Sequence, residues 1–138
     1  LLIGESTAEK IKKEIGTAIP TTNNVFLMKG RDIRTGTPKE ISLTEEDACE
    51  ALMPILNQML AAIKEALEST PPELSADLVD MGLVLTGGGA LLKNIDKLIS
   101  KDTGLPVTIA DNPLECVAIG TGKALENEEL FSTMLSEY

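Results

Sequence analysis

The stretch from residue 83 to residue 110 constrains the fold of this chain more than any other. An apolar run, Leu-Val-Leu-Thr at residues 83–86, leads into three consecutive glycines, and a second run, Val-Thr-Ile-Ala, occupies residues 107–110. The segment between them, from Ala90 to about Lys101, has helical periodicity. Nearly continuous apolar strands joined by a helical crossover are typical of parallel pairing in an α/β sheet covered by helices. A last helix is predicted from Pro113.

The first part of the chain predicts a helix and then a small antiparallel pair of strands. The sequence Ser-Thr-Ala-Glu at residues 6–9 matches a capping box, so the helix is predicted to begin at Ser6 and to continue to about Thr17. The strands are expected at residues 25–29 and 39–43, and a turn is expected at residues 30–32. The positions predicted to form the buried stripe of the helix are Ala8, Ile11, Ile15 and Ala18.

A long helix is predicted from Thr44 to about Ser69. Thr44 suits the N-cap, and the acidic run at residues 45–47 complements the positive end of the helix dipole, which accounts for that run without a metal ion. Pro54 lies inside the helix and is expected to kink it. A short helix from residue 71 to 78 is predicted to close at Gly82 with a left-handed cap. The predicted buried face of the long helix comprises Ala48, Leu52, Ile55, Met59, Ile63 and Leu67.

Charge and composition exclude several classes of function. The chain carries 22 acidic and 12 basic residues, a formal charge of −10, which disfavours binding to nucleic acids. It has no histidine, and Cys49 and Cys116 lie far apart, so the usual zinc sites and histidine-based catalytic pairs are excluded within this chain. No apolar run approaches the roughly 20 residues of a membrane-spanning helix. The chain opens on Leu-Leu-Ile-Gly without a methionine, which predicts a cut inside a longer protein.

The three glycines at residues 87–89 are the strongest local sign of a binding site. Where a strand turns into a helix, bare backbone can approach a ligand and helix N–H groups can point toward it. The turn is not a Walker loop, because no Gly-Lys-Ser/Thr follows, and it is not a dinucleotide fingerprint, because Leu92 occupies the third glycine position. From spacing alone, a tight turn that serves only packing is favoured over ligand binding, because glycines at strand–helix junctions often serve only packing.

A family resemblance decides between these interpretations. The sequence LTGGGALL at residues 85–92 resembles the adenosine motif of the superfamily that contains actin, sugar kinases and DnaK-type chaperones. Further stretches, in the same order and spacing, are similar to the MreB family of bacterial actin-like proteins. They are IGESTAEKIKKEIG at residues 3–16, KGRD at 29–32, TPPEL at 70–74, DNPLECVA at 111–118 and GTGKAL at 120–125.

The resemblance implies a nucleotide site with contributions from two parts of the chain. The glycine turn would line the adenosine and proximal phosphates, and Leu91 would border the base. From the first helix, Glu9, Lys12 and Lys13 would reach the ribose and base; a solvated Glu9–Lys13 pair is the alternative for those charges. No catalytic or metal-binding residue is predicted within this chain. The residues implied for the turn are Gly87, Gly88, Gly89 and Ala90.

The same resemblance implies the C-terminal part of an actin-like, ribonuclease H-like ATPase fold of class α/β, with a smaller α+β subdomain. Residues 1–68 would form that smaller upper subdomain and its connecting helix. Residues 69–119 would form part of the larger α/β nucleotide-binding subdomain, and residues 120–138 a C-terminal helix and a weakly ordered acidic tail. The phosphate-binding hairpins of such proteins would lie outside this chain, so the 138 residues alone are expected not to hydrolyse ATP.

For the parent protein, the resemblance implies an ATP-hydrolysing protein that uses ATP with Mg²⁺ and polymerises head-to-tail into filaments that direct cell-wall synthesis and rod shape. Its expected partners are itself and membrane-associated cell-shape and wall-synthesis proteins, in the cytoplasm at the inner face of the cell membrane, with no membrane segment in this chain. Two alternatives stay open: a sugar-kinase or chaperone relative, and an interaction module whose nucleotide site is vestigial.

Overall fold

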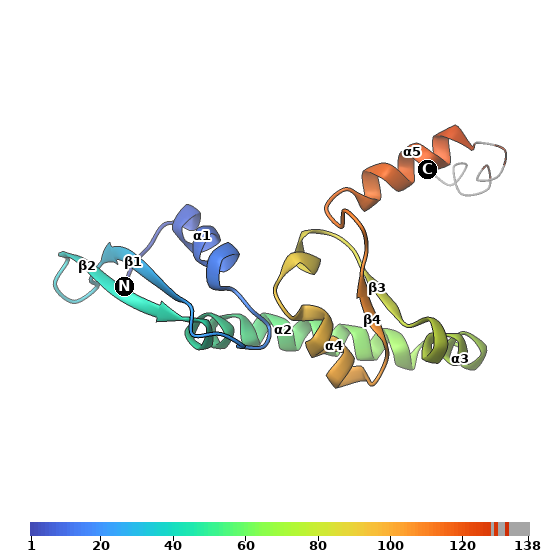
Figure 1. The fold of residues 1–138 in the computed structure, drawn as a ribbon, viewed down its shortest axis with the longest axis horizontal. Helices are drawn as coiled ribbons and strands as arrows, with labels where there is room; N and C mark the ends of the chain where they lie inside the picture. Colours follow the sequence, from blue (N-terminus) through green and yellow to red (C-terminus); the bar gives the residue numbers. More distant parts are fainter. Residues whose placement is uncertain (128, 130–131, 133–138) are drawn as a thin grey trace.

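The structure, a computed structural model, describes residues 1–127, 129 and 132. Figure 1 shows two groups of elements arranged along one long helix, α2, with the last helix, α5, standing apart from both. The predicted tail falls mainly on residues outside the described ones. In chain order the elements are α1 (Glu5–Ile15), β1 (Val25–Arg31), β2 (Pro38–Thr44), α2 (Glu45–Glu68), α3 (Pro72–Met81), β3 (Leu83–Leu85), the 3-10 turn η1 (Gly88–Leu91), α4 (Ile95–Thr103), β4 (Val107–Ile109) and α5 (Cys116–Glu126).

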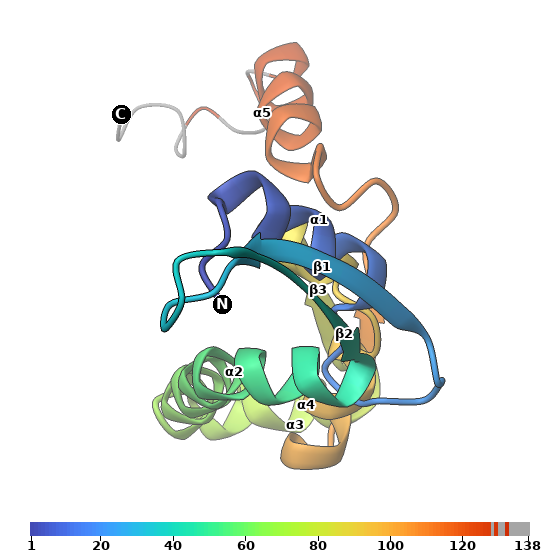
Figure 2. The same ribbon diagram turned by 90° about the vertical axis from the view of Figure 1, so that its left-hand side faces the viewer.

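The first group is a β-hairpin that packs on two helices. Strands β1 and β2 pair antiparallel, as predicted, and their register places Met28 opposite Ile41. Alternation along β1 places Phe26 and Met28 on the inner face and leaves Leu27 60% exposed on the outer face. Figure 2 shows the curved hairpin with α1 behind and above it and α2 below it. The buried residues of this first core cluster are Ile11, Ile15, Met28 and Ala48.

The second group contains the parallel pair that the sequence predicts. Strands β3 and β4 pair in parallel, with Val84 opposite Thr108, and α4 forms the crossover between them. The buried residues of this second core cluster are Ala18, Leu56, Ile95 and Ile99. Helix α2 therefore contributes to both clusters, through Ala48 to the first and through Leu56 to the second.

Helix α1 does not begin with the predicted capping box. Gly4 takes the N-cap position in an extended conformation, where no described side chain accepts a hydrogen bond, and Ser6 lies inside the helix. The Glu9 carboxylate turns instead to Lys12, at 2.6 Å. In contrast, α2 begins where predicted: Thr44 Oγ1 accepts the Asp47 N–H at 3.2 Å, and Asp47 accepts the Thr44 N–H at 2.8 Å. This reciprocal pair is a true capping box.

The predicted buried face of α2 is partly wrong. Ile55 is 59% exposed and Met59 is 38% exposed, whereas Leu56, which was not predicted, is 2% exposed. The helix carries apolar residues on two sides, and the second core cluster takes the side that contains Leu56. Pro54 lies inside the helix as expected, and a kink there stays a prediction.

The connection after the glycines also differs from the prediction. The turn leads into η1, and α4 begins only at Ile95, with Asn94 in the left-handed conformation before it. The glycines therefore do not open an α-helix directly. Gly82, after α3, has φ 72° and ψ −165° rather than a left-handed cap. There a Cβ atom would overlap the Pro106 carbonyl oxygen, so close approach of the two segments requires glycine.

Candidate nucleotide site

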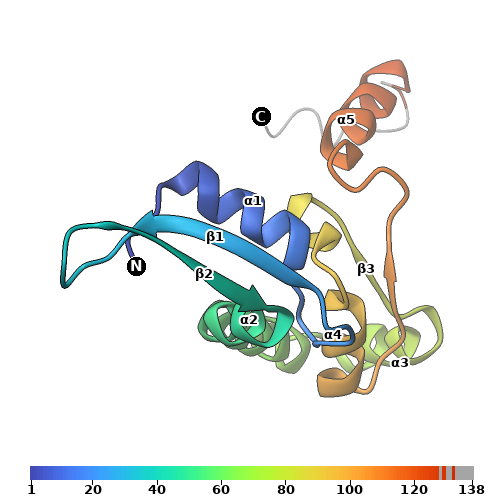
Figure 3. The same ribbon diagram turned by 60° about the vertical axis from the view of Figure 1, so that its left-hand side comes forward.

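A cavity of about 540 Å³ lies where the two groups of elements meet. Helix α1 forms one wall, the glycine turn with η1 forms the other, and α2 forms the floor. In Figure 3 the end of α1 lies next to the segment that leads from β3 into α4. The lining residues are Glu9, Lys12, Lys13, Glu14 and Gly16 from α1 and its end, Leu52, Ile55, Leu56 and Met59 from α2, and Gly88, Gly89, Leu91, Leu92, Lys93, Ile95 and Leu114.

The α1 wall carries an ion-pair network centred on Glu9. Its carboxylate lies 2.6 Å from Lys12 Nζ and 3.9 Å from Lys13 Nζ. The hydrogen bond from Lys12 is the main cause that lowers the pKa of Glu9 below its ordinary value. All three side chains are about half exposed or more, so the pairs are open to exchange with a ligand. The pair considered from sequence, Glu9 with Lys13, exists, but Lys12 is the closer partner.

The glycine wall is bare backbone. Gly87 has φ 83° and ψ 173°, and its N–H donates to the Pro113 carbonyl at 2.7 Å, which fixes the turn against the segment after β4. A Cβ atom on Gly89 would meet no described atom within 4 Å, so the space beside it is open to a ligand. Of the residues implied for this turn, Gly88, Gly89 and Leu91 line the cavity, whereas Ala90 is only 4% exposed and packs inward. Contacts of any of these residues with a nucleotide stay a prediction.

Sequence reasoning missed the floor of the cavity and one of its lysines. Ile55 and Met59 were predicted to be buried, but they face this space. An apolar floor between polar walls suits the flat face of a base. The sequence did contain a signal for this floor, because α2 carries apolar residues on more than one side. A helix that packs on one side alone would leave some of these residues exposed. Lys93 was not singled out either, because it has no neighbour in sequence that suggests a role.

The charge of the cavity differs from that of the chain. Three lysines and two glutamates line it, although the formal charge of the whole chain is −10. One of these lysines, Lys93, is held by Glu45 at 2.9 Å, and Glu45 lies outside the lining. With Glu45 counted, three lysines face three glutamates, so the cavity is close to neutral in a chain that is strongly acidic, and it repels an anionic ligand less than the rest of the surface does.

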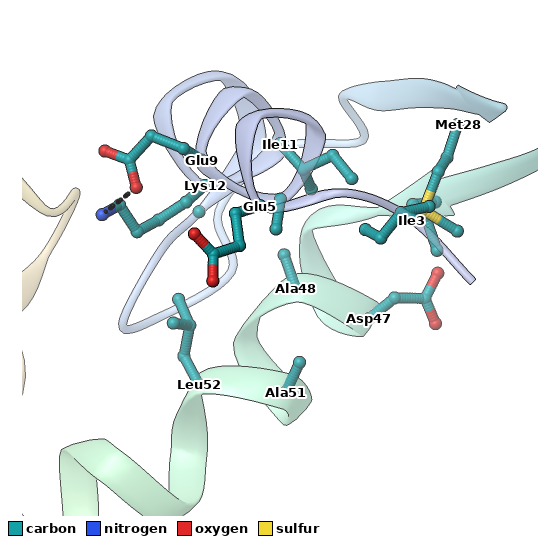
Figure 4. A pocket seen from close by; sticks show the side chains of 13 residues that line it. Ile3, Glu5, Glu9, Ile11, Lys12, Met28, Asp47, Ala48, Ala51 and Leu52 are labelled. Atoms are coloured by element: carbon teal, nitrogen blue, oxygen red, sulfur yellow. Dashed lines mark ion pairs between the residues drawn. The ribbon is translucent and has the colours of Figure 1, made fainter. Parts of the chain in front are cut away.

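A second cavity, of about 470 Å³, lies between α1, the hairpin and the start of α2. Figure 4 shows its lining: Ala48, Ala51 and Leu52 on α2 lie across from Glu5 and Ile11, and the Glu9–Lys12 pair projects away from them. This cavity is mostly apolar and the glycine turn does not reach it. It is therefore a poorer candidate for a nucleotide.

Two absences apply to the described part of the chain. Within it, no three His, Cys, Asp or Glu side chains gather as a group that could hold a metal ion. No helix among the described residues is both long and apolar enough to cross a membrane.

Comparison with solved structures shows the class of fold. The chain superposes on MreB5 of Spiroplasma citri bound to ADP with a TM-score of 0.89, at 35% identity, covering 94% of this chain and 40% of that one. The same protein bound to AMPPNP gives a TM-score of 0.88 at 34% identity, covering 100% of this chain and 41% of that one. The fold is therefore that of the actin-like proteins.

Comparison of sequences shows the family. The model of the MreB/Mbl protein family matches residues 1–133. The cell shape-determining protein Mbl of Bacillus cereus is 50% identical over 128 residues, covering 92% of this chain and 38% of Mbl. The cell shape-determining protein MreB of Escherichia coli is 48% identical over 126 residues, covering 91% of this chain and 36% of MreB. The chain belongs to the MreB/Mbl family of actin-like, cell shape-determining cytoskeletal proteins, and it spans well under half the length of these relatives.

Proposed function

We propose that this chain supplies one side of an adenine nucleotide site in a filament-forming, ATP-hydrolysing cytoskeletal protein that directs cell-wall synthesis and rod shape. The observation that carries the proposal is the shared cavity: Glu9, Lys12 and Lys13 of α1 face Gly88 and Gly89 across it. Two similar solved structures were obtained with ADP and with AMPPNP, which supports an adenine nucleotide as the ligand.

Each lining group has a chemical task in this proposal. Glu9 accepts a hydrogen bond from a ribose hydroxyl, and the Lys12 stem covers one face of the base while its ammonium group stays in solvent. Gly88 and Gly89 let the backbone approach the sugar and the proximal phosphate without a side chain in the way. Ile55 and Met59 give the base an apolar floor.

Hydrolysis is assigned to the parent protein and not to these 138 residues. Phosphoryl transfer depends on positioning of the metal, the phosphates and the attacking water. The described residues offer no carboxylate cluster for Mg²⁺, so in this proposal the ion is held mainly through the nucleotide phosphates and by residues outside this chain. The chain alone binds nucleotide weakly and does not turn it over.

The cellular part of the proposal follows the family. The parent protein assembles head-to-tail with copies of itself, in the cytoplasm at the inner face of the membrane. Its other partners are membrane-associated cell-shape and wall-synthesis proteins. Nucleic acid is not a partner, in keeping with the charge of −10.

A nuclear magnetic resonance titration tests the site in the 138-residue chain. Backbone amide shifts are recorded while ADP with Mg²⁺ is added to millimolar concentration, which detects weak binding. Shift changes are expected to centre on Glu9, Lys12, Gly88 and Gly89. Gly88→Val should abolish them, because its Cβ would already lie 3.1 Å from Leu114 and the larger side chain fills the cavity. Shift changes centred elsewhere, or none, would refute the site.

Two further measurements complete this test. Gly120→Val, on α5, is the matched control, because the space beside Gly120 is open and it does not line the cavity. This variant should keep the shift changes. Phosphate release from ATP is followed in parallel and should not exceed the rate measured in buffer without protein. Hydrolysis by the chain alone would contradict its assignment to the parent protein.

A further inference from the structure

Glu45, the first residue of α2, is a buried carboxylate whose task is not explained by the helix that it begins. It is 1% exposed, and among the described residues only Thr17 joins it as a buried polar side chain. Acidic residues in the first turn of a helix are favoured by the dipole, but this effect does not require burial. A charged group that is removed from water needs partners that replace its hydration.

Four hydrogen bonds meet that need. Glu45 Oε2 accepts the backbone N–H groups of Thr21 at 3.1 Å and Thr22 at 3.0 Å. Oε1 accepts the Thr22 hydroxyl at 2.6 Å and Lys93 Nζ at 2.9 Å. Bonds from the Thr22 hydroxyl and then from Lys93 lower the pKa of Glu45 to about 2, so the carboxylate stays charged at any pH near neutrality.

These partners come from two segments that are far apart in sequence. Thr21 and Thr22 belong to the segment that leaves α1, and Lys93 follows η1. The same two segments also meet directly, because the Ala18 N–H donates to the Lys93 carbonyl at 2.8 Å and Asn94 Nδ2 donates to the Ile19 carbonyl at 2.8 Å. Lys93 is therefore held at its backbone and at its side chain.

The position of this junction relates it to the cavity. Lys93 lines the cavity two residues after Leu91, and the segment held by Glu45 continues from α1, which carries Glu9 and Lys12. The junction thus joins the two walls of the cavity at one end. Glu45 itself does not line the cavity.

We propose that Glu45 is a positioning residue for the nucleotide site: through Lys93, Thr21 and Thr22 it fixes the separation of the α1 wall and the glycine wall. Buried ion pairs are weak sources of net stability, and their better-attested use is to select one arrangement of the elements that they join. The test of this inference by affinity for ADP rests on the proposed function, whereas its test by the distance between the two walls needs no ligand.

The inference makes a distinctive prediction about Lys93. A lysine that binds the nucleotide directly would be released by Glu45→Gln, and affinity would rise. A lysine that acts through Glu45 gives the opposite result: Glu45→Gln and Lys93→Met each weaken binding of ADP by about tenfold, and the double variant is no weaker than either single one. Lys93→Met leaves three hydrogen bonds on Glu45 but removes its cation, whereas Glu45→Gln removes the buried charge itself, so the fold of both variants is first checked by circular dichroism.

A matched control is available in the same region. Lys64 on α2 pairs with Asp102 on α4 at 2.9 Å, which is another ion pair between two elements, but neither residue lines the cavity. Lys64→Met should leave affinity for ADP unchanged. An equal loss of affinity in Lys64→Met would show a general effect of loosening the fold and would overturn the role of Glu45.

The geometric test uses spin labels and needs no ligand. Cysteines replace Lys10 on α1 and Lys97 on α4 in a background without Cys49 and Cys116, and the distance distribution between the labels is measured by pulsed electron paramagnetic resonance. Glu45→Gln and Lys93→Met should broaden or shift this distribution, and Lys64→Met should not. An unchanged distribution in both variants would overturn the inference. If the labels respond but the original chain does not bind ADP, the junction stands and the proposed function fails.

Discussion

Replacing Gly87 by alanine should lower the free energy of unfolding by about 1–2 kcal/mol. Gly87 has φ 83° and ψ 173°, a region that is open essentially to glycine alone, and holding another residue there costs about 1–3 kcal/mol. Alanine also restricts the unfolded chain, which returns about 0.4–1 kcal/mol. A Cβ atom at this position would meet no described atom within 4 Å, so the loss comes from backbone strain and not from a clash.

Gly89→Ala is the matched control two residues further on. Gly89 is not among the glycines with positive φ, and a Cβ atom there also meets no described atom within 4 Å. The variant should be as stable as the original chain, or more stable by up to about 1 kcal/mol. Because Gly89 lines the cavity and Gly87 does not, Gly89→Ala should be the variant whose direct effect is on nucleotide affinity.

The assay is urea denaturation followed by far-ultraviolet circular dichroism, because the chain contains no tryptophan to report by fluorescence. The dependence of the free energy on urea should be unchanged between variants, so that the shift in midpoint reports stability alone. Equal stability of Gly87→Ala and Gly89→Ala, or a larger loss in Gly89→Ala, would refute the assignment of strain to Gly87.

Three further predictions use the same assay. Thr44→Ala should lower the free energy of unfolding by about 1 kcal/mol, because it removes a capping box. Ser6→Ala should change it by no more than about 0.5 kcal/mol, because Ser6 lies inside α1. Equal losses in the two variants would contradict these assignments. Gly82→Ala should cost more than Gly87→Ala, since its Cβ atom would also overlap the Pro106 carbonyl; a neutral effect would contradict that contact. The folded pKa of Glu45, about 2, lies below its ordinary value of 4.5, so its stabilisation is complete above about pH 4.5 and is lost as pH falls toward 2. As pH falls from about 4.5 toward 2, the urea midpoint should therefore decrease more steeply in the original chain than in Glu45→Gln. The same dependence of the midpoint on pH in both proteins would contradict this.

The strands and their pairing could be predicted because their signals are local. The apolar runs at Leu83–Leu85 and Val107–Ile109 are bounded by glycine, proline and a helical segment, and only a parallel arrangement suits a crossover of that length. The hairpin of β1 and β2 follows from two short strand patterns with a turn between them. In both cases the residues that decide the structure are close together in sequence.

Glu45 shows why the rest could not be predicted. Its position in the first turn of a helix is fully explained by the dipole, so nothing nearby in sequence points to a further role. Its decisive partner, Lys93, is 48 residues away. The choice of Leu56 over Ile55 as the buried residue of α2 has the same origin, because periodicity offered two apolar sides and the packing of α4 selected one.

The candidate site shows a different limit. The prediction that Glu9, Lys12 and Lys13 belong to a nucleotide site rested on the family resemblance alone. Their pattern did not suggest it, because an exposed glutamate with two lysines one turn away is also an ordinary surface network. The structure adds what neither pattern nor resemblance had identified: Ile55 and Met59 as the floor between the two walls.

The exposure of Ile55 and Met59 follows from the way α2 serves both core clusters. A helix of 24 residues is about 36 Å long, enough to reach from the hairpin to the parallel strands. Ala48 packs in the first cluster and Leu56 in the second, whereas Ile55 and Met59 line the cavity between the two groups. A shared helix fixes how far apart the two groups lie along its axis, and Ala18, which follows α1, also packs in the second cluster. The polar junction at Glu45 adds a restraint between the same two groups, so in its proposed role a residue that does not line the cavity sets the geometry of the site.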